Sequence, residues 1–131
     1  VKYQVDRELF QFGRKLVVRD ASGTEVCFVQ HIPFSIPCAY ELAVPGGSVQ
    51  LDRHFSFFSQ RYSVDALGWD VSGSFLSLEF EITQGARRVA YIEKAWPAFH
   101  DRYRLEIADG KDELTALCVV LAIDMEAERH N

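Results

Sequence analysis

Apolar and polar residues alternate along most of this chain, in short runs that end near a glycine. Tyr103, Leu105 and Ile107 fall on one face of an extended segment, whereas Arg104 and Glu106 fall on the other. The same alternation recurs at 61–64 and 78–82, where β-branched and aromatic residues are frequent. This pattern is typical of strands with one buried face, so we expect half-buried strands in these segments.

A longer repeat organises these strands. An apolar residue, a second apolar residue six positions later and a glycine shortly afterwards recur five times, as Phe12–Val18–Gly23, Ile36–Leu42–Gly47, Phe58–Val64–Gly68, Leu76–Ile82–Gly85 and Phe99–Leu105–Gly110. The spacing fits a unit of two short strands and a turn, and it is too irregular for a solenoid. Glycine supplies the positive φ that tight turns require. We therefore expect about ten antiparallel strands in 1–108. Because open sheet edges invite pairing with other chains, a closed barrel is the favoured arrangement.

The last segment of the chain breaks this repeat. Residues 112–128 contain neither glycine nor proline, and their apolar residues fall at helical spacing, which predicts a helix at about 112–127. Asp109 or Asp112 can cap its first turn. Residues 116–123 are apolar on every side of the helix, but these eight residues are far fewer than the ~20 that a membrane span needs. We expect the helix to lie inside the barrel and fill its lumen.

Composition and charge narrow the function. The chain has 131 residues, which indicates a single domain over 1–131. Its 14 basic and 19 acidic residues leave a net charge of −5, which argues against a dedicated nucleic-acid-binding protein. Three cysteines without CxxC spacing favour a reducing compartment, and the N-terminal residues lack the apolar segment of a signal peptide. The expected location is the cytoplasm.

Several segments together resemble a known family. They are Phe57-Phe58 with Arg61-Tyr62, Gly68-Trp69-Asp70-Val71 with Gly73 and Phe75, Trp96 with Asp101 and Tyr103, Glu106-Ile107-Ala108-Asp109-Gly110, and Ala122-Ile123-Asp124. Nearly the whole chain is similar to the bacterial LURP-one-related proteins. Their fold resembles that of the C-terminal domain of tubby proteins and of phospholipid scramblases. The Gly-Trp-Asp-Val-x-Gly segment is the most specific part of the resemblance.

The resemblance implies more about fold than about function. The family barrel is usually described with twelve strands, whereas the repeat predicts about ten. Either ten strands close around the helix, or the N-terminus or a second subunit covers the gap. Tubby proteins bind phosphoinositides through a basic surface, and scramblases are linked to calcium and lipid movement. The resemblance supplies no catalytic residues.

One candidate binding surface is basic. Arg87, Arg88, Lys94, Arg102 and Arg104 lie on two strands that should pair as neighbours, and we call these five residues the basic patch. Such a cluster can attract an anionic lipid headgroup. The competing interpretation is a solvated outer surface, because Glu93 and Glu106 lie among the basic residues.

Other candidate sites have simpler structural explanations. Asp109, Asp112 and Glu113 occupy the place of the scramblase calcium segment, but their spacing is not that of an EF-hand loop and helix capping accounts for them. The four histidines, His31, His54, His100 and His130, show no metal-ligand spacing, and Cys38 and Cys118 are expected to be small core residues. No serine-hydrolase, P-loop or dinucleotide motif is present.

Two further positions have predicted structural roles. Asp124 ends an otherwise apolar helix, so we expect it to pair with a barrel residue at the mouth of the lumen. A ligand or proton site at Asp124 is the alternative. Trp69 is expected to anchor the core, and Asp70 to help set the preceding turn.

The sequence thus predicts a non-enzymatic binding module without a cofactor. Its outer surface is expected to contact anionic phospholipid or a protein partner, because the helix fills the lumen. The alternative function is a small-ligand carrier with a pocket at one mouth of the barrel.

Overall fold

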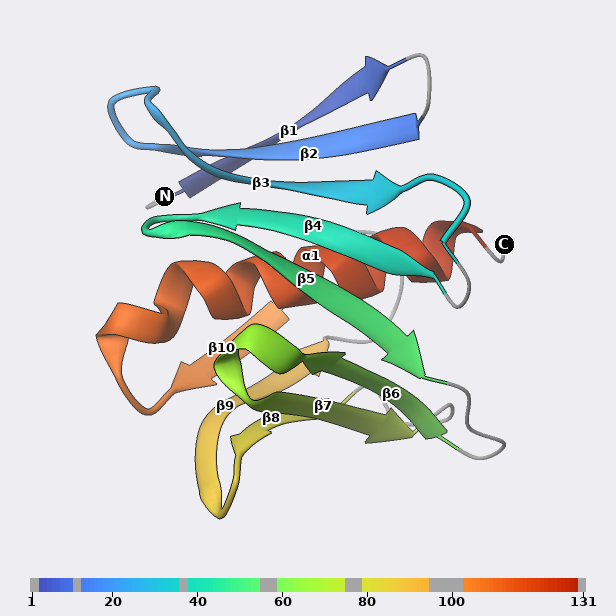
Figure 1. Ribbon diagram of the computed structural model, residues 1–131. Coiled ribbons are helices and arrows are strands. Elements are labelled where there is room, and N and C mark those ends of the chain that lie inside the picture. Colours follow the sequence, from blue (N-terminus) through green and yellow to red (C-terminus); the bar gives the residue numbers. More distant parts are fainter. Residues whose placement is uncertain are drawn as a thin grey trace.

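The fold is one meandering sheet curved around one helix (Figure 1). The structure is a computed structural model that describes residues 3–10, 13–35, 38–54, 59–74, 79–94 and 103–129. Ten strands pair in chain order, and every neighbouring pair is antiparallel. The strands are β1 (Tyr3–Phe10), β2 (Gly13–Asp20), β3 (Glu25–Ile32), β4 (Ala39–Val44), β5 (Gly47–His54), β6 (Ser59–Val64), β7 (Trp69–Ser74), β8 (Glu79–Gln84), β9 (Arg87–Lys94) and β10 (Tyr103–Ile107). The predicted meander of about ten strands is confirmed.

The buried face of the sheet follows the predicted alternation. Val18 lies opposite Cys27 across β2 and β3, and Val29 lies opposite Leu42 across β3 and β4. All four side chains are buried, because inward-facing residues of neighbouring strands meet on the concave face of the sheet. On β6, Tyr62 is buried in the same way. Within the described residues the core is built mainly from one face of the strands, although the neighbours Val89 and Ala90 on β9 both belong to it.

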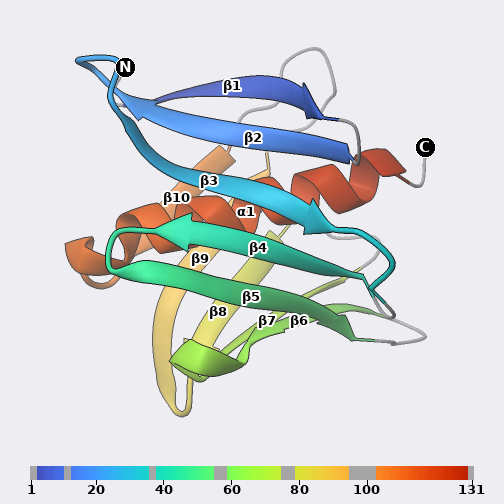
Figure 2. The same cartoon turned by 45° about the horizontal axis from the view of Figure 1, so that its top comes forward.

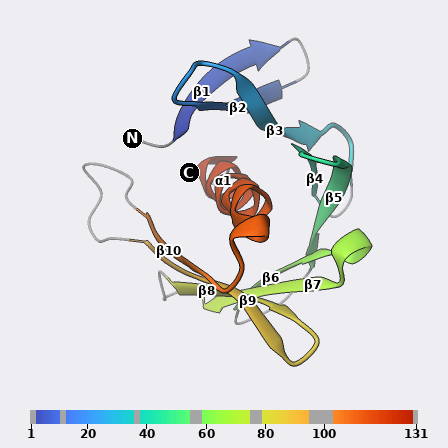
Figure 3. The same ribbon diagram turned by 90° about the vertical axis from the view of Figure 1, so that its left-hand side faces the viewer.

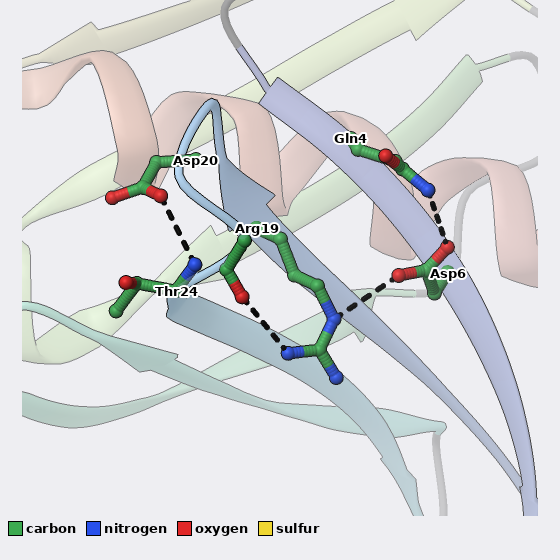
Figure 4. A network of polar contacts seen from close by, with 6 residues as sticks. Gln4, Asp6, Arg19, Asp20 and Thr24 are labelled. Carbon is green, nitrogen blue, oxygen red and sulfur yellow. Dashed lines mark hydrogen bonds and ion pairs between the residues drawn. The ribbon is translucent and has the colours of Figure 1, made fainter.

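Glycine and aspartate build the turn between β2 and β3. Gly23 has φ +87°, a conformation that other residues rarely adopt. The Asp20 carboxylate accepts a hydrogen bond from the backbone N–H of Thr24 at 3.0 Å (Figure 4). It also accepts one from the backbone N–H of Ser22 at 2.9 Å. These bonds and that from the Ser22 hydroxyl lower the pKa of Asp20. The turn is of the kind that the Asp-Ala-Ser-Gly sequence predicts.

A polar contact also ties the first strand to its neighbour. The Arg19 guanidinium donates to the Asp6 carboxylate at 3.1 Å and reaches the Gly23 carbonyl oxygen at 3.4 Å (Figure 4). Both ionic side chains are about one-third exposed, so solvent screens much of their attraction. The contact orients β1 against β2 and adds little to stability.

The helix lies in the concave interior of the sheet. A short 3₁₀ helix, η2 (Gly110–Asp112), leads into α1 (Glu113–Arg129), which packs against β3, β4 and β10. Figures 2 and 3 show the strands curving around α1. The consecutive residues Cys118–Ile123 are all buried, and at 3.6 residues per turn they cover every side of the helix. The predicted helix and its central position are confirmed. No helix in the described part of the chain combines the length and hydropathy of a membrane span.

The predicted closure of the barrel is not confirmed. The hydrogen-bonded order runs from β1 to β10, and no pairing joins these two edge strands within the described residues. Figure 3 shows the two edges on the same side of the molecule with a gap between their ribbons. The observed architecture is a curved ten-stranded antiparallel sheet around a C-terminal helix.

Several residues of the Gly-Trp-Asp-Val-x-Gly segment have clear structural roles. A single 3₁₀ turn, η1 (Asp65–Leu67), precedes β7, and Gly68 ends it with φ +66°. Trp69 is buried, as predicted. At Gly73, a Cβ atom would come within 2.4 Å of the Phe80 ring on β8, so only glycine fits there. Asp70 differs from the prediction: it lies within β7 opposite Ser63 and Thr83, after the turn has ended.

Candidate binding surface and buried polar cluster

The described part of the basic patch lies on neighbouring strands, as predicted. Arg87 and Arg88 begin β9 and Arg104 lies in β10, which pairs with β9. Lys94 ends β9, but its side chain lies outside the described residues, as does Arg102. Arg87 and Arg88 are both exposed. The register between β8 and β9 shifts just after them, where Val89 is the extra residue of a bulge.

Each described arginine of the basic patch lies beside a carboxylate. Arg88 is 2.9 Å from Glu81, and Arg104 is 3.0 Å from Glu106. Arg87 is 3.6 Å from Asp112 on η2. A paired charge contributes much less to the long-range field that attracts an anionic membrane. The competing interpretation of a solvated, mixed-charge surface therefore gains support.

The acidic segment before the helix is used locally. The Asp109 carboxylate accepts a hydrogen bond from the Lys111 backbone N–H at 3.0 Å and so caps η2, the 3₁₀ turn that precedes α1, rather than the first turn of α1 itself. Asp112 contacts Arg87, and Glu113 lies in the first turn of α1. The described residues contain no group of three or more histidine, cysteine or acidic side chains placed to hold a metal ion.

A buried polar cluster joins the second half of α1 to the sheet. We call Tyr40, Arg53 and Glu126 the buried polar cluster. The Tyr40 hydroxyl donates to the Glu126 carboxylate, and the Arg53 guanidinium lies 2.6 Å from it. Glu126 is almost fully buried, whereas the Arg53 side chain is 30% exposed. A buried carboxylate is costly unless it is paired and hydrogen-bonded, and here both conditions are met.

Tyr62 lies beside this cluster on β6, opposite Arg53 on β5. Burial raises the pKa of the Tyr62 phenol to about 12. Arg53 opposes this shift and Glu126 reinforces it. Tyr62 therefore stays a neutral hydroxyl across the physiological pH range.

The acid that the sheet encloses is Glu126, two positions after Asp124, which is only partly buried. The expected pairing of Asp124 with a barrel residue stays a prediction. A signal for Glu126 is present in the sequence. It follows Ala122 by four positions and Val119 by seven, which places it on the buried face that those residues share. Residues 116–123 before it are apolar on every side of the helix, so the sequence pattern does not show which face of the helix continues to Glu126.

Two thiols meet in the core. The Cys118 thiol on α1 donates to the Cys27 sulfur on β3, with 3.2 Å between the two Sγ atoms. Both are buried, and all three cysteines are free thiols. Cys118 is a core residue as predicted, whereas Cys38 is only partly buried.

The histidines within the described residues take part in separate contacts. The His31 ring lies edge-on to Tyr40, with 5.3 Å between the ring centres. His54 Nε2 lies 2.6 Å from the Ser63 hydroxyl, beside an open pocket of about 460 Å³ that Arg61, Asp65 and Asp70 also line. His100 and His130 lie outside the described residues.

The turn between β3 and β4 presents an aromatic side chain to solvent. Phe34 is 94% exposed and has φ +62°, a left-handed conformation that is costly for a residue with a bulky side chain. Ser35 holds the turn from both sides: its hydroxyl donates to the Ile32 carbonyl at 2.7 Å and accepts from the Ala39 N–H at 2.9 Å. A shallow pocket of about 210 Å³, lined by residues that include His31 and Pro33, lies next to it. The alternation of apolar and polar residues does not single out Phe34.

Comparisons with known proteins identify relatives of this chain. The chain is 25% identical over 124 residues to the uncharacterized protein YxjI of Bacillus subtilis (strain 168), and the match covers 94% of this chain and 76% of that protein. No solved structure matches the chain. The sequence profile of the LURP-one-related family matches residues 1–124, so the chain belongs to the LURP-one-related family.

Proposed function

We propose that this chain is a non-enzymatic binding module that engages a protein partner through its outer surface at the β3–β4 turn. The observation that carries the proposal is the enclosure of α1. Since Cys118–Ile123 are buried on every side of the helix, the concave face of the sheet is occupied by the chain's own side chains. A partner is therefore recognised by the outer surface of the sheet.

The β3–β4 turn is the best-supported contact point on that surface. An exposed aromatic side chain held in a fixed position loses little conformational entropy on binding, and aromatic residues are frequent anchors of protein interfaces. Phe34 combines both properties, because the Ser35 hydrogen bonds hold the turn that presents it. A strained φ at an exposed aromatic residue is also more readily retained for function than for stability.

Anionic phospholipid is the second candidate partner. It would bind at the basic patch, where Arg88 and Arg104 are well exposed. The neighbouring Glu81 and Glu106 weaken this candidate, because they compensate the charges that a headgroup would contact.

The small-ligand carrier is the least supported function. The pockets of about 210 to 460 Å³ that described residues line are open at the surface. A carrier site buries most of its ligand in an enclosed pocket, and here α1 takes the place such a ligand would need. A cytoplasmic location is proposed alongside the binding role, supported by the three free thiols.

A photoactivatable residue at position 34 tests the protein-partner proposal. Position 21, in the exposed turn between β2 and β3, is the matched control. We expect a crosslinked partner from position 34 only, and we expect excess unlabelled wild-type protein to compete for it while Phe34→Asn protein does not. Equal crosslinking from both positions would contradict the proposal.

A vesicle experiment tests the lipid candidate in parallel. Sedimentation with neutral and anionic vesicles over a salt series reports charge-driven binding, which must weaken as ionic strength rises. We expect no such binding. Salt-sensitive binding to anionic vesicles that Arg88→Gln and Arg104→Gln abolish would replace the protein partner with a lipid surface.

A further inference from the structure

We propose that Cys27 and Cys118 are an oxidation site, at which a peroxide converts the two thiols into a disulfide that locks α1 to β3. The proposal rests on the placement of the thiols in the core and is independent of the proposed partner. The two sulfurs come from elements 91 residues apart in the sequence. A bond between them would make the central helix and the sheet covalently continuous.

The distance between the two sulfurs favours this reaction. The Sγ atoms lie 3.2 Å apart, already in contact, and a disulfide bond requires them to approach by about 1.2 Å more. Their side chains are 3% and 0% exposed, so the sheet and the helix hold both sulfurs in place. Cys38, the third cysteine, is partly buried and lies just before β4, outside this sulfur pair.

The pKa values of the two thiols shift in opposite directions, and this difference decides which thiol reacts first. The hydrogen bond from Cys118 lowers the pKa of Cys27. The same bond, together with burial, raises the pKa of Cys118. Because the thiolate is the nucleophile, Cys27 is the sulfur that reacts first and Cys118 is the resolving thiol.

The reaction balances with hydrogen peroxide as the oxidant. The Cys27 thiolate attacks one peroxide oxygen and the O–O bond breaks, which gives a sulfenic acid and hydroxide. The Cys118 sulfur then attacks the sulfenic sulfur, the S–O bond breaks, and the hydroxyl leaves with the Cys118 proton as water. Overall, two thiols and one peroxide give one disulfide and two waters. Peroxide suits this site because it is small enough to reach a buried sulfur through local opening of the core.

The disulfide would hold α1 in place against β3. A bridge across so long a loop removes much conformational freedom from the unfolded chain. The oxidised protein is therefore expected to melt roughly 10 °C above the reduced protein. The amides of α1 should also exchange with solvent more slowly, because the helix can no longer leave the sheet without unfolding it.

Counting reactive thiols tests the proposal directly. The folded protein is treated with hydrogen peroxide, quenched, denatured and alkylated, and the labels are counted by mass spectrometry. The reduced protein should take three labels, one for each cysteine. The oxidised protein should take one label, on Cys38, and recover all three after reduction. Peptide mapping should show Cys27 joined to Cys118.

Three variants serve as controls. Cys38→Ser should still form the disulfide, whereas Cys27→Ser should take two labels whether or not peroxide was added. Cys118→Ser should form no disulfide, and peroxide should leave its Cys27 as a sulfenic acid that takes no label. An unchanged label count in the wild-type protein, or a bridge that includes Cys38, would overturn the site. A correct bridge that leaves the melting temperature unchanged or lower would overturn the lock.

Discussion

The buried polar cluster predicts that replacing Arg53 and replacing Glu126 lower the free energy of unfolding by different amounts. Glu126 is 3% exposed and Arg53 is 30% exposed, although their charged atoms are only 2.6 Å apart. Replacing Arg53 by methionine removes the counter-charge of a carboxylate that water cannot reach. Replacing Glu126 by glutamine instead leaves a guanidinium that can turn toward water and an amide that can still accept from Tyr40.

The expected magnitudes follow from that asymmetry. Loss of the counter-charge of a buried ion is expected to cost about 3 kcal/mol, so Arg53→Met should lose roughly this amount of unfolding free energy at neutral pH. Glu126→Gln should lose about 1–2 kcal/mol, mainly from weakened hydrogen bonds to a formerly charged group. The double variant Arg53→Met/Glu126→Leu should recover part of the loss, because it buries no charge.

Urea unfolding, followed by tryptophan fluorescence to which the buried Trp69 contributes, measures these differences. The exposed Arg61 on neighbouring β6 provides a control, and Arg61→Met should change stability by less than about 0.5 kcal/mol. Equal costs for Arg53→Met and Glu126→Gln would refute the reasoning, since they would mean that both groups are equally solvated.

Three further predictions test other parts of the fold. The Tyr62 pKa of about 12 lies above the ~10 of an unfolded tyrosine, so ionisation should remove up to about 2–3 kcal/mol of stability as the pH rises from 10 to 12. An absorbance titration measures the Tyr62 pKa, and Tyr62→Phe should abolish the loss of stability. Gly73→Ala should cost about 1–3 kcal/mol in urea unfolding, because its Cβ would come within 2.4 Å of the Phe80 ring, and an effect below 0.5 kcal/mol would contradict that contact. Phe34→Asn should leave stability unchanged or raise it by up to about 1 kcal/mol in thermal and urea unfolding, because asparagine tolerates positive φ and the 94% exposed phenylalanine buries little surface; a clear loss of stability would show that the ring is packed.

The sequence was informative wherever a residue's environment depends on its near neighbours. Alternation correctly predicted buried Tyr62 and Val64 on β6 and exposed Arg104 and Glu106 on β10, although Ser63 is buried as well. Gly23, Gly68 and Gly85 mark turns at positive φ, as the repeat implied. The helix was predictable because residues 112–128 contain neither glycine nor proline and place apolar residues at helical spacing. These features are local, and the strand and helix periods record them directly.

The sequence was less informative where a contact depends on strand register or joins residues far apart in the chain. Arg88 meets Glu81 across a strand pair whose register is shifted by a bulge, and Arg87 meets Asp112 on η2, 25 positions later in the chain. Neither pairing follows from alternation alone, so the basic patch looked more strongly charged in the sequence than it is in the structure. Phe34 was missed for a related reason, because its exposure depends on the turn that Ser35 holds and not on a periodic pattern.

The buried polar cluster shows how part of that long-range information is present in the sequence after all. Arg53 continues the inward-facing row of Leu51 on β5, and Glu126 continues the buried face of α1. Each is a charged residue at a position where its neighbours on the same face are apolar. Since a lone buried charge is expensive, two such exceptions of opposite sign are expected to meet. The exceptions to the hydrophobic pattern therefore carry information about pairing, and here they align the second half of the helix with β4 and β5.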